Sequence, residues 1–421
     1  MHFIDKGLFI MSKLPTSPLA VALPSLPPVP GVRLASIEAG LRYSGRLDLT
    51  LMEFAPSTTV AGVFTKNKCP GAPIDWCRSV LSNGTARGLL VNAGIANVFT
   101  GKAGFEAVQH SAEAAAKAIG CHAEEIFVAS TGVIGEQLPY QKIVHIIPKL
   151  YQQLDDNQWT ETAQAILTTD TFAKGYSLKT KIGTETVIIQ GIAKGSGMIA
   201  PDMATMLSFV TTDAKLPASV LQALLSEKVK TTFNAITVDS DTSTSDTLLL
   251  FATGIANTPE ITDASDPRLT DFANSLEKIL KELALLVIKD GEGVSKLIEI
   301  TVDGAVSHES AHKIAMAIGN SPLVKTAITG EDANWGRVVM AVGKAGEPAN
   351  RDTLSVSIGG VWVAHEGGVL SDYDRTIVDR HMSEETVKIK VDLHLGNGTA
   401  TIWSCNLTKG YIDINGSYLR S

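Results

Sequence analysis

Apolar residues recur along the chain with two spacings, and each spacing predicts one kind of element. Alternation and short β-branched runs predict strands at residues 59–65, 88–92, 125–130, 207–212, 247–253, 295–302, 353–358, 387–395 and 399–404. Three- and four-residue steps, together with alanine content, predict helices at residues 105–119, 140–154, 160–167, 218–231 and 269–290. A glycine directly follows the first and the last of these helices, as is common at helix ends.

The order of these elements indicates the fold class. Strands and helices are mixed in the first half, whereas several strands follow one another late in the chain. This order favours a mixed or antiparallel sheet over a doubly wound parallel one. The chain has 421 residues, enough for a large core. We therefore predict a mixed α/β or α+β architecture of layered sheets and helices, preceded by a proline-rich, extended or disordered lead-in over residues 1–30.

Composition argues against several classes of protein. The net charge is −8, and no run of Lys or Arg suggests a nucleic-acid partner. No apolar stretch approaches the length of a membrane-spanning helix. The nine histidines show no metal-binding spacing, and the four cysteines form no CxxC pair, so we expect no metal site and four free thiols in the reducing cytoplasm. The composition therefore favours a protein that acts on small molecules over one that binds nucleic acid or spans a membrane.

One segment, KGSGMIAPDMATMLSFVTTDA from Lys194 to Ala214, carries candidate chemistry. Thr205 follows the small residue Ala204 and precedes an apolar strand. A hydroxyl is a poor nucleophile until a base removes its proton, and one solution uses the threonine's own α-amine, freed by cleavage of the preceding bond. A nearby cation such as Lys194 would lower the pKa of that amine. By itself the spacing is a weak signal, because Ala-Thr before a strand is common.

The segment resembles the self-cleaving centre of the ornithine acetyltransferase family, also called the bifunctional glutamate N-acetyltransferases of arginine biosynthesis. Further blocks resemble the family in the expected order: STGVIG from Ser130, TTDT from Thr168, TVDSDTSTSD from Thr237, SPLVKTA from Ser321, NWGR from Asn334, and the tail INGSY from Ile414. The resemblance covers nearly everything after Gly31.

The resemblance implies a role for each matching residue. Thr205 would cut the bond after Ala204 and then accept the acetyl group, with acetylornithine as donor and glutamate as acceptor in a ping-pong reaction. The remaining matches are the oxyanion pair Thr131 and Gly132, and the substrate contacts Thr168, Lys194, Glu292, Asn415 and Ser421. Lys194 would hold an α-carboxylate, and Glu292 would hold the ammonium of ornithine.

The family also implies an organisation and a set of partners. Residues 31–204 would form an α chain and residues 205–421 a β chain, interwoven in one unit that assembles as a dimer of heterodimers. No cofactor is expected, and the sequence leaves open whether acetyl-CoA is also a donor. Two alternative functions remain open. One is a self-processing amide hydrolase with the same type of nucleophile, and the other is an unprocessed binding protein that has the family's fold but is not an enzyme.

Overall fold

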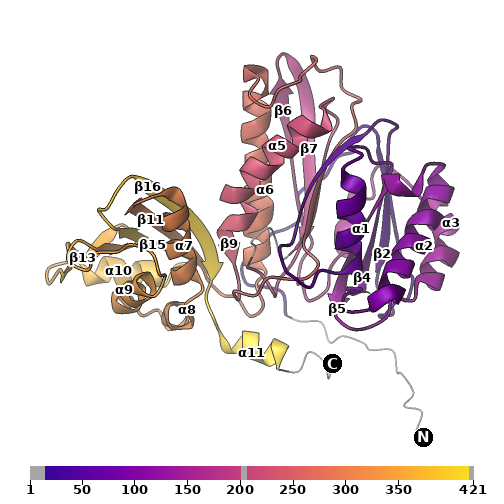
Figure 1. Cartoon of the computed structure of the whole chain (residues 1–421). Helices are drawn as coiled ribbons and strands as arrows, with labels where there is room; N and C mark the ends of the chain where they lie inside the picture. Colours follow the sequence, from indigo (N-terminus) through magenta and orange to yellow (C-terminus); the bar gives the residue numbers. More distant parts are fainter. Residues whose placement is uncertain (1–14, 201–205, 417–421) are drawn as a thin grey trace, which may run out of the picture.

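The computed structural model describes residues 15–200 and 206–416, which form three β-sheets flanked by helices (Figure 1). The strands are β1 (Val32–Ile37), β2 (Leu49–Phe54), β3 (Thr59–Phe64), β4 (Gly88–Ile95), β5 (Ile126–Val133), β6 (Lys174–Ile182), β7 (Glu185–Lys194), β8 (Leu207–Thr212), β9 (Ile236–Thr237), β10 (Thr247–Ala252), β11 (Leu297–Ala305), β12 (Ser355–Ile358), β13 (Val361–His365), β14 (Gly368–Val369), β15 (Thr386–Asp392) and β16 (Gly398–Cys405). The α-helices are α1 (Ala72–Leu81), α2 (Gly101–Ile119), α3 (Tyr140–Gln152), α4 (Trp159–Ala165), α5 (Ala218–Lys228), α6 (Thr270–Lys289), α7 (His308–Gly319), α8 (Pro322–Thr329), α9 (Trp335–Gly343), α10 (Arg375–Met382) and α11 (Lys409–Asn415).

Two of the sheets stack face to face. The first has the strand order β1-β2-β4-β5 and the second the order β3-β10-β8-β7-β6. Along β10, Leu249 and Phe251 pack toward the first sheet, whereas Leu248 and Leu250 pack toward α5 and α6. Phe54 stacks on Phe251 with ring centroids 4.2 Å apart and so joins the two sheets. Because both faces of β10 are buried, its sequence is apolar from Leu248 to Ala252.

Helices cover the two outer faces of this pair of sheets. The first sheet packs against α1, α2 and α3, and the second packs against α5 and α6 (Figure 1). The result is a helix–sheet–sheet–helix arrangement, which confirms the layered α+β architecture expected from the sequence. The second sheet takes β3, β6 and β7 from before position 205 and β8 and β10 from after it, so the two segments are interwoven.

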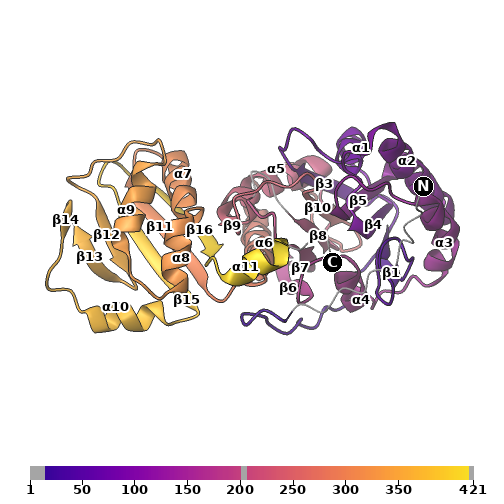
Figure 2. The same cartoon turned by 90° about the horizontal axis from the view of Figure 1, so that it is seen from below.

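A third sheet forms a separate lobe, visible in Figure 2. Its strand order is β14-β13-β12-β15-β11-β16-β9, and α7 packs on β11 and β16. Helix α11 follows β16 and lies at the junction between this lobe and the rest of the chain (Figure 2). There Thr408 donates a hydrogen bond to the carbonyl of Gly293, 2.6 Å away, which ties α11 to the loop after α6.

Several expected elements have other bounds in the structure, and one difference matters for the site. The strand expected at residues 125–130 continues to Val133, so Thr131 and Gly132 lie within β5 rather than in a turn after it. This extension is paired, because Thr131 and Gly132 lie opposite Ala93 and Gly94 of the parallel strand β4. The helix expected to reach residue 231 ends at Lys228 and continues as a 3-10 turn.

Candidate active site

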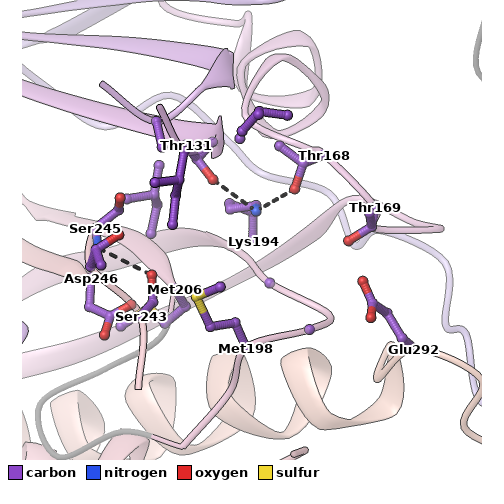
Figure 3. Close-up of a pocket in the computed structure, with 18 of the residues that line it drawn as sticks. Thr131, Thr168, Thr169, Lys194, Met198, Met206, Ser243, Ser245, Asp246 and Glu292 are labelled. Carbon is purple, nitrogen blue, oxygen red and sulfur yellow. Dashed lines mark hydrogen bonds between the residues drawn. The ribbon is translucent and has the colours of Figure 1, made fainter. Parts of the chain in front are cut away.

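A pocket of about 390 Å³ opens where β5 and β7 end and where β8 and β10 begin. These strand ends meet because β7 runs antiparallel to β8 and β10 runs parallel to β8. The lining residues include six of those that the sequence analysis singled out: Thr131, Gly132, Thr168, Lys194, Glu292 and Asn415. Figure 3 shows Lys194 between Thr131 and Thr168, with Glu292 toward one end and Asp246 toward the other. Thr205, Ala204 and Ser421 lie outside the described residues.

Lys194, the last residue of β7, is buried at the centre of this pocket with 7% of its surface exposed. Its ammonium donates hydrogen bonds to Thr168 Oγ1 at 2.6 Å and to Thr131 Oγ1 at 3.1 Å (Figure 3). Burial lowers the pKa of Lys194, and the carboxylate of Asp170, 3.6 Å away, opposes that shift. The structure therefore presents a cation whose orientation is fixed by two hydroxyls.

A buried network of charges holds Lys194 in place. Lys174 Nζ lies 2.7 Å from Asp170 and 2.6 Å from Asp290, and the main-chain N–H of Gly195 donates to Asp170 at 2.6 Å. Burial acts to raise the pKa of Asp170, but the ammonium groups of Lys174 and Lys194 outweigh it and lower that pKa. Two lysines thus face two carboxylates. Neither Asp170 nor Lys174 was assigned a role from the sequence, although Asp170 lies inside the TTDT block.

Thr131 and Gly132 are placed by the pairing of β5 with β4. Because Lys194 donates to Thr131 Oγ1, the proton of that hydroxyl must point elsewhere, which leaves Thr131 able to donate to a ligand. Gly132 has φ +131°, and a Cβ there would lie 2.6 Å from the main-chain nitrogen of Ile95 and closer still to the carbonyl of Gly94. Only glycine lets the two backbones approach this closely.

Replacing Gly132 with alanine is expected to cost stability, because the added methyl group collides with the backbone of β4 and not with a movable side chain. We expect the free energy of unfolding to fall by about 2–4 kcal/mol, measured by urea denaturation. Gly135 provides the matched control, since its φ is +88° but nothing lies within 4 Å of a Cβ built there. A loss at Gly132 no larger than the loss at Gly135 would contradict this explanation.

Glu292 lies in the loop between α6 and β11 and is 8% exposed. Asn415 of α11 donates to Glu292 Oε2 at 2.6 Å, and the main-chain N–H of Glu292 donates to the carbonyl of Ser196 at 2.9 Å. Burial raises the pKa of Glu292, and the hydrogen bonds from Asn415 and Thr169 oppose part of that rise. A Cβ at Gly197 would lie 2.6 Å from this carboxylate, so glycine permits the close approach.

The two neighbouring threonines at 168 and 169 both line the pocket but have different partners. Thr168 accepts from Lys194, whereas Thr169 Oγ1 lies 2.7 Å from Ser196 Oγ. The structure therefore places Thr168 beside the cation and Thr169 on the side of Glu292.

Within residues 15–200 and 206–416, no three His, Cys, Asp or Glu side chains gather closely enough to hold a metal ion. None of the helices in these ranges combines the length and the apolar character needed to cross a bilayer. All four cysteines are free thiols.

The layered α+β fold contains a polar pocket with a buried lysine, a site that suits a small molecule. A profile of the ArgJ family matches residues 33–420. The arginine biosynthesis bifunctional protein ArgJ of Gluconobacter oxydans is 58% identical over 415 residues, which cover 99% of this chain and 98% of that protein. The chain belongs to the ArgJ family and is an acetyltransferase, which confirms the family resemblance inferred from the motifs.

Two solved structures are also similar to this chain. The arginine biosynthesis bifunctional protein ArgJ of Bacillus halodurans is 40% identical, with a TM-score of 0.48 over 50% of this chain and 98% of that one. The ornithine acetyltransferase of Mycobacterium tuberculosis, crystallised in complex with ornithine, is 35% identical, with a TM-score of 0.37 over 42% of this chain and 94% of that one.

Proposed function

We propose that the chain transfers an acetyl group from N2-acetyl-L-ornithine to L-glutamate, through an acetyl ester on Thr205. The hydroxyl becomes reactive when the chain cuts itself between Ala204 and Thr205 and frees the α-amino group of Thr205. Membership of the ArgJ family supports this function, as does the name of the Gluconobacter relative, a bifunctional protein of arginine biosynthesis. The observation that carries the proposal is a pocket, next to Met206, that brings together a buried cation, a buried carboxylate and a hydroxyl donor.

Charge complementarity suggests how the donor would bind. Acetylornithine carries an α-carboxylate and a side-chain ammonium. The ammonium of Lys194 suits the carboxylate, and the carboxylate of Glu292 suits the ammonium. Both protein groups are buried, so each interaction would form in a site that contains little water, where attraction between charges is stronger. The acetylated α-nitrogen would then lie near the carboxylate end, beside Thr131.

The chemistry balances as two acyl transfers. The α-amine of Thr205 takes the hydroxyl proton while the oxygen attacks the acetyl carbonyl. The Thr131 hydroxyl and the Gly132 N–H would stabilise the oxyanion, and one such donor is typically worth about 3–4 kcal/mol of barrier. The α-ammonium then passes its proton to the departing nitrogen, so ornithine leaves as an amine. Glutamate then attacks the acetyl ester on Thr205, and the same proton transfers occur in the reverse order.

Mass spectrometry tests the proposal directly. The purified protein is incubated with acetylornithine alone, and the fragment that begins at position 205 is weighed. We expect a gain of one acetyl group, which disappears when glutamate is added while acetylglutamate forms. If that fragment never carries acetyl, the proposed ester is wrong. Release of acetate without glutamate would instead identify the amide hydrolase, and an intact, inactive chain would identify the unprocessed binding protein.

Three further properties belong to the same proposal. The fragments 31–204 and 205–421 would stay together as a heterodimer, and two heterodimers would assemble in the cytoplasm. No cofactor is required, because every proton in the scheme moves between groups of the chain and the substrates. Acetyl-CoA would serve as a second donor if the protein forms acetylglutamate from glutamate and acetyl-CoA without acetylornithine.

Replacing Glu292 with glutamine is expected to weaken donor binding, because the amide cannot pair with the substrate ammonium. We expect KM for acetylornithine to rise about 10²-fold, with a smaller effect on KM for glutamate, from steady-state kinetics. The wild-type KM for acetylornithine should also rise as the pH falls, because protonation removes the charge of Glu292. Burial raises the pKa of Glu292, so this loss begins at a higher pH than for an exposed glutamate. An identical pH profile in the glutamine variant would contradict the assignment.

A further inference from the structure

Helix α11 presents Asn415 to the pocket, although the helix has no buried residue of its own. It is only seven residues long, from Lys409 to Asn415. A helix this short does not keep its position in water without contacts to other elements. The place of Asn415 beside Glu292 is therefore fixed by the residues that anchor this end of the chain to the loop after α6 (Figure 2).

Asn406 directly follows β16 and provides the first anchor. It is 3% exposed, and its side-chain amide uses its full hydrogen-bonding capacity. Oδ1 accepts from the main-chain N–H groups of Ser295 at 3.0 Å and Lys296 at 2.9 Å. Nδ2 donates to Ser295 Oγ at 2.8 Å and to Thr329 Oγ1 at 3.1 Å. One buried amide thus joins the end of β16 to the loop that carries Glu292 and to α8 of the third lobe.

Thr408 and Gly293 provide the second anchor. Thr408 Oγ1 donates to the carbonyl of Gly293 at 2.6 Å and accepts from the main-chain N–H of Gly410 at 3.0 Å, which caps α11. Gly293 has φ +73°, and a Cβ there would collide with the main-chain nitrogen of Tyr411. Glycine is therefore needed for α11 to begin this close to the loop.

The anchors follow one another in order toward the pocket. Asn406 bonds to the loop three and four residues beyond Glu292, and Thr408 bonds to it one residue beyond. Asn415 then reaches Glu292 itself, 2.6 Å from Oε2. Neither Asn406 nor Thr408 lines the pocket, so we expect each to affect a ligand through the residues that it holds in place.

We propose that Asn406 and Thr408 are positioning residues that hold the Glu292 carboxylate in place for a ligand with a side-chain ammonium. The inference rests on the proposed function only in assigning that ammonium to Glu292. A charge-assisted hydrogen bond is short and directional, so a shift of the carboxylate by about 1 Å weakens it. Through these two residues, the third lobe contributes to the affinity of the pocket.

The expected effect falls on binding and not on the chemical step. In acetylornithine the length of the side chain separates the ammonium from the acetylated α-nitrogen. The contact between Glu292 and the ammonium is then the same in the bound substrate and in the transition state. Loss of such an interaction raises KM and leaves kcat unchanged. Glutamate has no side-chain ammonium, so its KM should change little.

Steady-state kinetics of Asn406→Ala and Thr408→Val test the inference. We expect each substitution to raise KM for acetylornithine about tenfold, with kcat and KM for glutamate within about threefold of the wild type. Thr180→Val is the matched control, because Thr180 Oγ1 accepts from Ser275 at 2.8 Å and lies about 20 Å along β6 from Lys174. This control also loses one hydrogen bond and should keep both KM values.

A double-mutant cycle separates the positioning of Glu292 from a general structural role. In a chain that already carries Glu292→Gln, Asn406→Ala should raise KM for acetylornithine by no more than about twofold, because the carboxylate that it positions is gone. A general structural role would give the same rise in both backgrounds. Independent, additive effects of the two substitutions would therefore overturn the inference.

Calorimetric titration with ornithine gives a measurement that does not depend on acetyl transfer. The dissociation constant for ornithine should rise in Asn406→Ala and in Thr408→Val by the same factor as KM for acetylornithine. Unchanged affinity in both variants would overturn the inference. If urea denaturation shows that Asn406→Ala is unfolded, the result for Thr408→Val decides.

The wild-type chain distinguishes this inference from the proposed function. A wild type that binds ornithine but transfers no acetyl group would overturn the proposed function, whereas the loss of ornithine affinity in the variants would still support the positioning role. A wild type that binds no ornithine would overturn both.

Discussion

A chain with alanine at position 205 is expected to remain uncut and to lose at least about 10⁴-fold in acetyl transfer. In the proposed mechanism this hydroxyl both attacks the preceding carbonyl and carries the acetyl group, and the substitution removes it. Denaturing electrophoresis should show a single band of full length, whereas we expect two fragments of similar size from the wild type. Residual activity would come only from binding and from oxyanion stabilisation, which do not form the ester.

The serine variant at the same position is the control for this experiment. Thr205→Ser keeps the hydroxyl, so we expect cleavage and measurable transfer. The two wild-type fragments should also elute together from a sizing column under native conditions, because β3, β6 and β7 share a sheet with β8 and β10. A wild-type chain that stays whole and is nevertheless active would show that the mechanism is wrong.

Replacing Asp170 with asparagine is expected to lower the free energy of unfolding by about 3–5 kcal/mol, because the change leaves the buried ammonium groups of Lys174 and Lys194 with one fewer carboxylate beside them. The side chains of Asp170 and Lys174 have no exposed surface, so water cannot compensate for the loss. The variant also removes the carboxylate 3.6 Å from the Lys194 ammonium, which should lower kcat/KM. Urea denaturation and steady-state kinetics measure the two effects. Glu347→Gln, which breaks the surface pair with Lys313, should leave stability unchanged within error.

The Asp170 ion pairs also predict how stability depends on pH. The folded pKa of Asp170 lies below its unfolded value, which is about 3.9 for aspartate. Its contribution to stability is therefore complete above about pH 4 and is lost as the pH falls below that value. The asparagine variant lacks this contribution, so the difference in stability between the two proteins should shrink in acid. A difference that stays constant from pH 6 to pH 3 would show that Asp170 does not act through its charge.

Elements with a strong local pattern were predicted well. The strand at residues 207–212 matches β8, and the strand at 59–65 matches β3 to within one residue. Helix α6 was expected from its repeating apolar positions and ends one residue earlier than predicted. The two strands form from short runs of apolar and β-branched residues, and the helix forms from a repeating apolar face. Both patterns can be read from the order of residues.

Elements whose pattern depends on distant contacts were missed. No strand was predicted at β6 or β7, although β6 is an edge strand of the second sheet and β7 pairs with both β6 and β8. In β7, Gly191 resembles a turn residue in the sequence. In the structure it makes room for α6, because a Cβ there would lie 2.9 Å from Leu283 Cδ1. The short strands and helices of the third lobe, such as β14 and α8, have too few residues to establish a period.

The sequence by itself determined the family, the layered fold class and the local elements, and it singled out the six described site residues that meet in one pocket. Only the tertiary structure decided which charges face each other. The pairing of Lys194 with Asp170 and the hydrogen bond from Lys194 to Thr131 depend on contacts between segments that are distant in the sequence. A side chain's pKa and hydrogen-bonding capacity follow from its burial and from the charges around it, which exist only once the strands have packed together.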